Sequence, residues 1–162
     1  MEIVLVTSPV DISKNYSLCS FSLFQPLTPL IWLFDWKAWY STSWRNSGIV
    51  ARAARFAKRT MCDRRCASAL ETLSRHPALV AELAEVLTVT DAEAASLVRT
   101  RLSHIQDMNE FMRLAGVVKD RVTCEPREDG CKQLCDLNED CWRHVMRYLK
   151  LDDICYPSET AE

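Results

Sequence analysis

The residues best suited to chemistry in this sequence are its eight cysteines and three histidines. Five of the cysteines lie near His144 in the last third of the chain, at Cys124, Cys131, Cys135, Cys141 and Cys155. A zinc site usually takes two ligands from one tight C-x2-C turn, and these spacings contain no such turn. We therefore predict no metal site and no cofactor, and we expect reduced cysteines, with disulfides or zinc as the alternatives.

Nucleophilic catalysis requires a Cys or Ser beside a His that an acid orients. Cys141 and His144 lie within one helical turn and would face each other only roughly, whereas His76 precedes a proline and His104 ends an amphipathic segment. The chain has only three glycines, which excludes the glycine-rich phosphate loops GxGxxG and GxxxxGK[ST]. These features predict that the protein is not an enzyme.

A cluster of arginines offers a different chemistry, the binding of anions. No Asp or Glu occurs from Trp36 to Cys62, and Arg52, Arg55 and Arg59 are spaced to share one side of a helix. A basic amphipathic helix without acids is typical of a mitochondrial transit peptide, which responds to the membrane potential. We therefore predict a transit-like segment at 41–60 and a mitochondrial protein. The alternative for this segment is a solvated basic helix end, and the alternative locations of the protein are the cytoplasm and the nucleus.

The elements that must position these residues are predicted to be helices. With 162 residues, 48% of them hydrophobic, the chain can bury the core of one domain. Apolar residues recur at three- and four-residue spacing between helix start and stop signals. The starts are predicted at Asp63, at Pro77, at the T-x-x-E capping box of Thr90 and Glu93, at Asp107 and at Asn138, and Gly116 is predicted to end a helix.

Helices of two or three turns are not stable alone, so they must stack against one another. We predict an all-α fold of short stacked helices, either a helical-repeat fragment or a small bundle. An irregular N-terminal extension is expected at 1–60, a helical domain at 61–155 and a tail at 156–162, with Met61 as an alternative start. No apolar stretch approaches the length of a membrane span, so no membrane insertion is predicted.

From Leu87 to Arg99 the sequence reads L-x-V-T-D-A-E-A-x-x-L-V-R, and a later set of positions is formed by Phe111, Met112, Gly116, Val117, Val122 and Pro126. This spacing within residues 83–126 resembles the repeat of the mitochondrial transcription termination factor (mTERF) family. In that family such repeats stack into a solenoid whose basic concave surface binds DNA or RNA in the organelle. The resemblance thus implies a non-catalytic, nucleic-acid-binding regulator of organellar transcription or translation.

The nucleic-acid contacts implied by this resemblance would come from five basic residues. They are Arg99, Arg101, Arg113, Lys119 and Arg121. Residues 91–122 also hold five acidic side chains, so binding requires the basic ones to share a face. The alternative is that they are ordinary solvated helix charges.

The C-terminal stretch L-N-E-D-C-W-x-x-V-M-x-Y-L-x-L-D-D is similar to the opening helix of an F-box. That resemblance implies an adaptor fragment whose helix docks on the Skp subunit of a cullin ubiquitin ligase. The partner-binding residues would be Leu137, Trp142, Val145, Met146 and Leu149. Two further interpretations are that this stripe packs on the preceding helices, and that the chain is a helical protein-interaction module that binds no nucleic acid.

Overall fold

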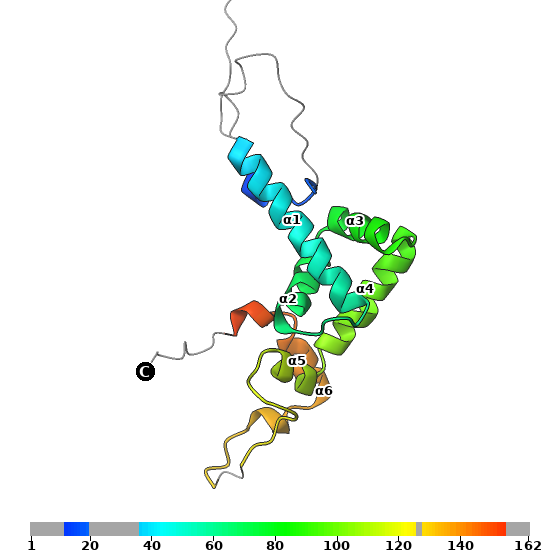
Figure 1. Cartoon of the computed structure of the whole chain (residues 1–162). Coiled ribbons are helices and arrows are strands. Elements are labelled where there is room, and N and C mark those ends of the chain that lie inside the picture. Colours follow the sequence, from blue (N-terminus) through cyan, green and yellow to red (C-terminus); the bar gives the residue numbers. More distant parts are fainter. Residues whose placement is uncertain (1–11, 20–35, 126–127, 155–162) are drawn as a thin grey trace, which may run out of the picture.

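The computed structural model describes residues 12–19, 36–125 and 128–154 (Figure 1). Within these ranges the chain forms six α-helices and short 3-10 turns, with no strand, which confirms the predicted all-α class. The α-helices are α1 (Trp36–Ala57), α2 (Arg64–Leu73), α3 (Pro77–Leu87), α4 (Asp91–Ile105), α5 (Met108–Leu114) and α6 (Glu139–Val145). The 3-10 turns are η1 (Ile12–Lys14), η3 (Leu134–Asp136) and η4 (Leu151–Asp153).

Side-chain caps set the starts of the helices where the sequence predicts them. The Asp63 carboxylate accepts a hydrogen bond from the Cys66 backbone N–H, and Thr90 and Glu93 form the reciprocal capping box at α4. The side chains of Asp107 and Asn138 cap α5 and α6 in the same way. These local bonds satisfy backbone N–H groups that a helix start leaves unpaired.

The remaining start and stop signals are also confirmed. Pro77 occupies the first turn of α3, where its missing N–H costs nothing. Gly116 follows α5 with a φ of 75°, the left-handed conformation that glycine adopts without strain. The predicted helices of residues 63–116 and 138–146 therefore exist, and each begins at its predicted cap.

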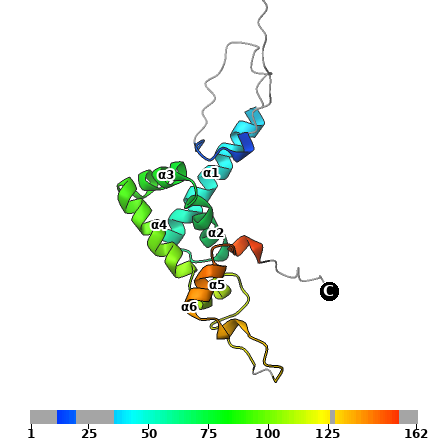
Figure 2. The same ribbon diagram turned by 180° about the vertical axis from the view of Figure 1, so that it is seen from behind.

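Helix α1 crosses the bundle and contacts α2, α3 and α4 (Figures 1 and 2). Its buried side chains join those of the shorter helices in one hydrophobic cluster. The large fully buried members of this cluster are Leu70, Leu73, Leu79, Leu83, Ile105, Phe111 and Leu151. The short helices thus stack on each other and on α1, while the first half of α1 projects beyond them (Figures 1 and 2).

The position of α1 differs from the predicted domain division. The sequence predicts residues 36–57 in the N-terminal extension, but Val50, Ala53 and Phe56 of α1 are buried in the core of the body. The buried face of α1 is rich in alanines, which carry little hydrophobic signal, so the sequence shows its arginines more clearly than its apolar face. Residues 1–11, 20–35 and 156–162 of the expected extension and tail lie outside the described residues.

The C-terminal helix packs on α5 through an aromatic pair. The rings of Phe111 and Trp142 meet edge to face with centroids 5.8 Å apart. The Trp142 indole N–H donates to the Gln106 backbone carbonyl over 2.7 Å, just beyond the end of α4. One side chain therefore joins α4, α5 and α6.

Candidate nucleic-acid interface

The exposed side of α1 carries a continuous set of cationic and aromatic side chains. We call it the basic face of α1 and define it by Lys37, Tyr40, Trp44, Arg52 and Arg55 of the helix and by Lys58, which directly follows it; all six are exposed. These residues follow one another at spacings of three, four or eight, which keeps them on one side of a helix. Because no acid occurs between Trp36 and Cys62, this face has no anionic side chain of its own.

Burial of the opposite side fixes the direction in which the basic face points. Val50, Ala53 and Ala57 are each no more than 2% exposed. Rotating α1 about its axis would expose these core residues and bury guanidinium groups, and burial of an unpaired charge is strongly unfavourable. The packing of the bundle therefore holds the basic face toward solvent.

A groove of about 600 Å³ lies beside this face, between α1 and α2. Its cationic lining comes from both helices, with Arg45 and Arg52 on α1 and Arg64 and Arg65 on α2. Hydroxyl groups of α2 also line it, and its acidic lining residue is Asp152. Four guanidinium groups around one groove favour an anionic ligand, because the guanidinium fork matches phosphate geometry.

Two of these arginines also hold the fold together. The Arg45 guanidinium donates to the backbone carbonyls of Ser13 and Asn15, the latter over 2.8 Å, and so attaches segment 12–19 to α1. The Arg64 guanidinium donates to the carbonyls of Leu151, over 2.7 Å, and Ile154. These bonds fix both guanidinium groups at the edge of the groove, and a carbonyl acceptor leaves the positive charge of Arg45 in place.

The other two arginines of the groove, Arg52 and Arg65, are exposed. In the part of the chain that the structure describes, neither forms an ion pair. A Cβ atom at Gly48 would lie 3.3 Å from Nη1 of Arg52, so the guanidinium lies across the backbone of Gly48. The glycine thus leaves room for this arginine beside the groove.

A hollow of about 400 Å³, lined by three arginines and by the acids Asp107 and Glu110, lies at the C-terminal end of α1. Arg59 lines it together with Arg101 and Arg113, two of the five residues predicted to contact nucleic acid. Arg101 donates through Nε and Nη2 to the Ala57 carbonyl, over 3.2 and 3.1 Å, and so caps the C-terminus of α1. Arg113 pairs with Glu110 over 2.9 Å, which raises the pKa of the Arg113 guanidinium.

The other three predicted contacts lie elsewhere. Arg99 is exposed on α4, and Lys119 and Arg121 are exposed in the segment that follows α5. Arg121 lines a different hollow, which Trp142 and Arg143 of α6 also line. The structure thus brings Arg101 and Arg113 together with Arg59. Pro126, the last residue of the repeat-like pattern, lies outside the described residues.

Sequence reasoning missed the groove arginines Arg45, Arg64 and Arg65. The signal that could have found them is the charge count of residues 36–65, which hold eight basic residues and the single acid Asp63. The carboxylate of that acid caps α2. The excess of positive charge is therefore a property of α1 and α2 together.

The apolar stripe of the C-terminal helix faces the interior of the protein. Trp142 and Met146 are 4% and 7% exposed. Leu137 and Leu149 are half-buried against the same core, and Val145 is 37% exposed. The residues expected to dock on a partner are therefore largely occupied by intramolecular packing.

Three thiols are shifted away from the reactive form. Burial raises the pKa of the Cys66 thiol to about 11, and burial also raises the pKa of Cys19. A hydrogen bond with the Cys124 thiol raises the pKa of Cys135. A raised pKa disfavours the nucleophilic thiolate. Among the described residues, no three His, Cys, Asp or Glu side chains are grouped so that they could hold a metal ion.

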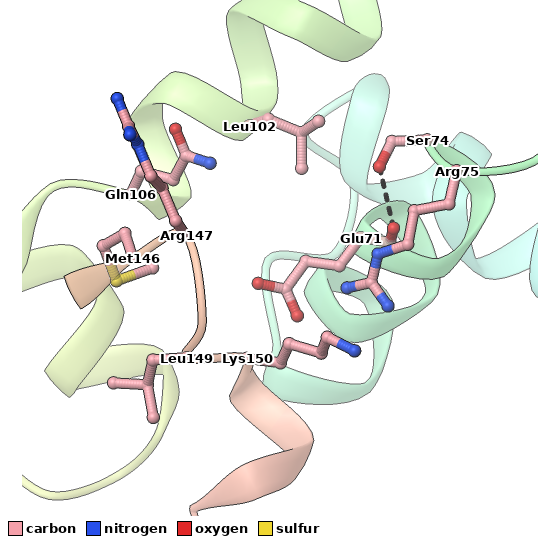
Figure 3. Close-up of a pocket in the computed structure, with 9 residues that line it drawn as sticks. All are labelled: Glu71, Ser74, Arg75, Leu102, Gln106, Met146, Arg147, Leu149 and Lys150. Carbon is pink, nitrogen blue, oxygen red and sulfur yellow. Dashed lines mark hydrogen bonds between the residues drawn. The ribbon is translucent and has the colours of Figure 1, made fainter. Parts of the chain in front are cut away.

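A second cavity, of about 300 Å³, lies where α2, α4 and the segment after α6 meet (Figure 3). The Glu71 carboxylate points into it and accepts a hydrogen bond from the Leu151 backbone N–H over 3.2 Å. Burial raises the pKa of Glu71, and this bond opposes the shift. Ser68 also donates to the Asp152 carboxylate over 2.7 Å. These contacts attach η4 to α2, so this cavity is where the C-terminal segment joins the bundle.

The length and apolarity of the helices bear on a membrane, and comparisons with known proteins bear on a family. No helix in the described ranges combines the length and apolarity that crossing a membrane requires. Comparison of the chain with protein-family models, with curated proteins and with solved structures found no match.

Proposed function

We propose that this protein is a non-catalytic, nucleic-acid-binding helical protein that contacts DNA or RNA through the basic face of α1 and the adjoining groove. The observation that carries the proposal is the acid-free, exposed helix face that the core holds toward solvent. Backbone phosphates are the ligand that matches such a surface, because cationic side chains that replace condensed counterions supply most non-specific binding to nucleic acid.

Four cationic side chains of this surface and groove are available to a ligand. In the described part of the chain, Arg52, Arg55, Lys58 and Arg65 form no ion pair with a carboxylate. Arg113 and Arg143, by contrast, pair with acids on their own helices. Each of the helices α2 to α6 contains at least one acidic residue, whereas α1 contains none.

The cellular part of the proposal is a role in mitochondria, in organellar transcription or translation, as the resemblance to the mTERF family implies. In that setting Arg99, Lys119 and Arg121 extend the contact beyond α1. Removal of residues up to 60 as a presequence would also remove Val50, Ala53 and Phe56 from the core. We therefore expect the mature protein to retain α1, and N-terminal sequencing of the imported protein tests this.

The adaptor alternative is less well supported by the geometry. Docking on a Skp subunit through the C-terminal helix would require Trp142 and Met146 to leave the core. Truncation of one buried aromatic side chain typically costs about 3–5 kcal/mol, which indicates the scale of what such a rearrangement loses. The basic face needs no rearrangement to bind.

The direct experiment measures binding of the full chain to a fluorescently labelled oligonucleotide by anisotropy at low salt. Replacing both Arg52 and Arg55 by Gln is expected to weaken binding about tenfold, if each arginine contributes about 0.7 kcal/mol through its phosphate. Arg143→Gln is the matched control, because its charge is already balanced on α6. The same test with Arg99→Gln and Arg121→Gln measures what the residues predicted from sequence contribute.

Two results contradict the proposal. One is the absence of binding to any oligonucleotide at low salt. The other is binding that the Arg52 and Arg55 substitutions leave unchanged, which would move the contact surface away from α1.

A further inference from the structure

We propose that the ligand of the basic face is single-stranded nucleic acid, and that Trp44, supported by Tyr40, is the platform on which a base stacks. This inference rests on the proposed function and specifies the class of nucleic acid. It comes from the two aromatic side chains that α1 exposes among its cations.

Both aromatic side chains of this face are largely exposed to solvent. Trp44 is 71% exposed and Tyr40 51%, although large aromatic residues are mostly buried in folded proteins. Their rings stack on each other, with centroids 6.2 Å apart and planes inclined by 29°. Tyr40 therefore supports Trp44 one helical turn away, and most of the indole surface remains open to a ligand.

The aromatic pair lies in line with the phosphate-binding charges. Trp44 and Arg55 are 11 positions apart on the same side of α1, which corresponds to about 16 Å along the helix axis. A cationic track beside a stacking platform is the general arrangement by which proteins bind single strands without reading sequence. The cations hold the backbone and the ring holds an unpaired base.

A nucleic-acid duplex would leave Trp44 without a function. The bases of a duplex are already paired and stacked on their neighbours, so an indole on the side of α1 cannot stack on them without base flipping. The phosphates of a duplex could still contact Arg52 and Arg55. The exposed indole therefore favours an unpaired strand over a paired one.

A membrane surface also attracts Trp, Tyr and cationic residues, but α1 lacks the apolar face that interfacial binding needs. Ile49, Val50 and Phe56, in the second half of α1, are buried against the other helices. Between the aromatics and the arginines, the exposed side carries only small residues such as Ser47 and Ala51. Charge complementarity with two exposed rings and no exposed aliphatic stripe favours a nucleic acid.

The test compares three probes on the full chain: an oligouridine, the same oligomer without bases, and a DNA duplex of equal phosphate count. Trp44→Ala is expected to weaken oligouridine binding at least about fivefold, the effect of losing one stacked base. Binding of the base-free oligomer and the duplex should be unchanged. Trp44→Phe, which keeps a ring, should recover part of the loss.

Tyr148→Ala is the matched control, because Tyr148 is 74% exposed but lies beyond α6 and away from the basic face. It should bind all three probes as the parent protein does. Both alanine variants change exposed side chains, so both should remain folded, with stabilities within about 0.5 kcal/mol of the parent.

Three outcomes overturn the inference, and the first two of them leave the proposed function standing. If Trp44→Ala binds oligouridine normally while Arg52→Gln with Arg55→Gln weakens it, the stacking role is refuted and phosphate binding stands. If Trp44→Ala weakens the binding of all three probes equally, the indole contributes to binding only by stabilising the fold. If no oligonucleotide binds and vesicles containing anionic lipid bind in a Trp44-dependent way, both proposals fail in favour of a membrane surface.

Discussion

Replacing Trp142 by Ala should destabilise the protein by about 3–5 kcal/mol, the usual cost of truncating a buried aromatic side chain. The structure supports the upper part of this range. The ring is 4% exposed, and its edge-to-face contact with Phe111 contributes about 0.5–1.5 kcal/mol beyond area burial. Its N–H bond to the Gln106 carbonyl contributes about 1 kcal/mol more.

Two further substitutions separate these contributions. Trp142→Phe keeps most of the apolar contact and loses the indole N–H, so it should cost about 1 kcal/mol. Tyr148→Ala removes an exposed ring from the same region and should change the free energy of unfolding by less than about 0.5 kcal/mol. Urea unfolding, monitored by far-UV circular dichroism, measures the free energy of unfolding of all three variants without depending on tryptophan fluorescence.

An unchanged urea midpoint for Trp142→Ala would refute this reasoning. It would mean that α6 does not pack on α5 as described and that its apolar stripe is free. The adaptor alternative requires that state, so this experiment also decides between the two accounts of the C-terminal helix.

Three other substitutions test separate parts of the structure. Burial raises the pKa of Glu71, so the folded state binds that proton more tightly than the unfolded chain, and the contribution of Glu71 to stability falls as pH rises through the raised pKa. Glu71→Gln should therefore gain stability relative to the parent from mildly acidic to neutral pH in thermal melts, and a constant difference would contradict the assignment. Arg101→Met keeps the alkyl stem but removes both bonds to the Ala57 carbonyl, so it should cost about 1–2 kcal/mol in urea unfolding; no loss would show that Arg101 does not cap α1. Gly48→Ala should stabilise α1 by about 0.5–1 kcal/mol and displace the Arg52 guanidinium, so a higher melting temperature should accompany weaker oligonucleotide binding; unchanged affinity would show that this position of Arg52 is unimportant.

The parts of the fold that the sequence predicts are those that depend on neighbouring residues. Asp63, the Thr90–Glu93 box and Gly116 act on the helix turn beside them, so their residue types and spacing are sufficient to place helix ends. The packing of α1 could not be predicted in this way. Its buried face includes small alanines such as Ala53, whose burial becomes evident only when α2 and α3 lie against them.

The candidate site shows the same division. The sequence places Arg52 and Arg55 on one side of a helix, and the structure confirms that both are exposed on α1. The sequence could not show that Arg101 would bind a carbonyl 44 positions away, or that Arg64 and Arg65 would face α1 across a groove. Long side chains can serve either the fold or a ligand, and only tertiary contacts decide which.

The most direct test of the central claim is the salt dependence of oligonucleotide binding. If phosphates contact the basic face of α1, affinity should fall steeply between about 50 and 200 mM salt. Replacing Arg52 and Arg55 by Gln should reduce the slope of log affinity against log salt by about 0.7 for each single-strand phosphate that the variant no longer neutralises. A slope that these two substitutions leave unchanged would contradict the assignment of α1 as the nucleic-acid interface.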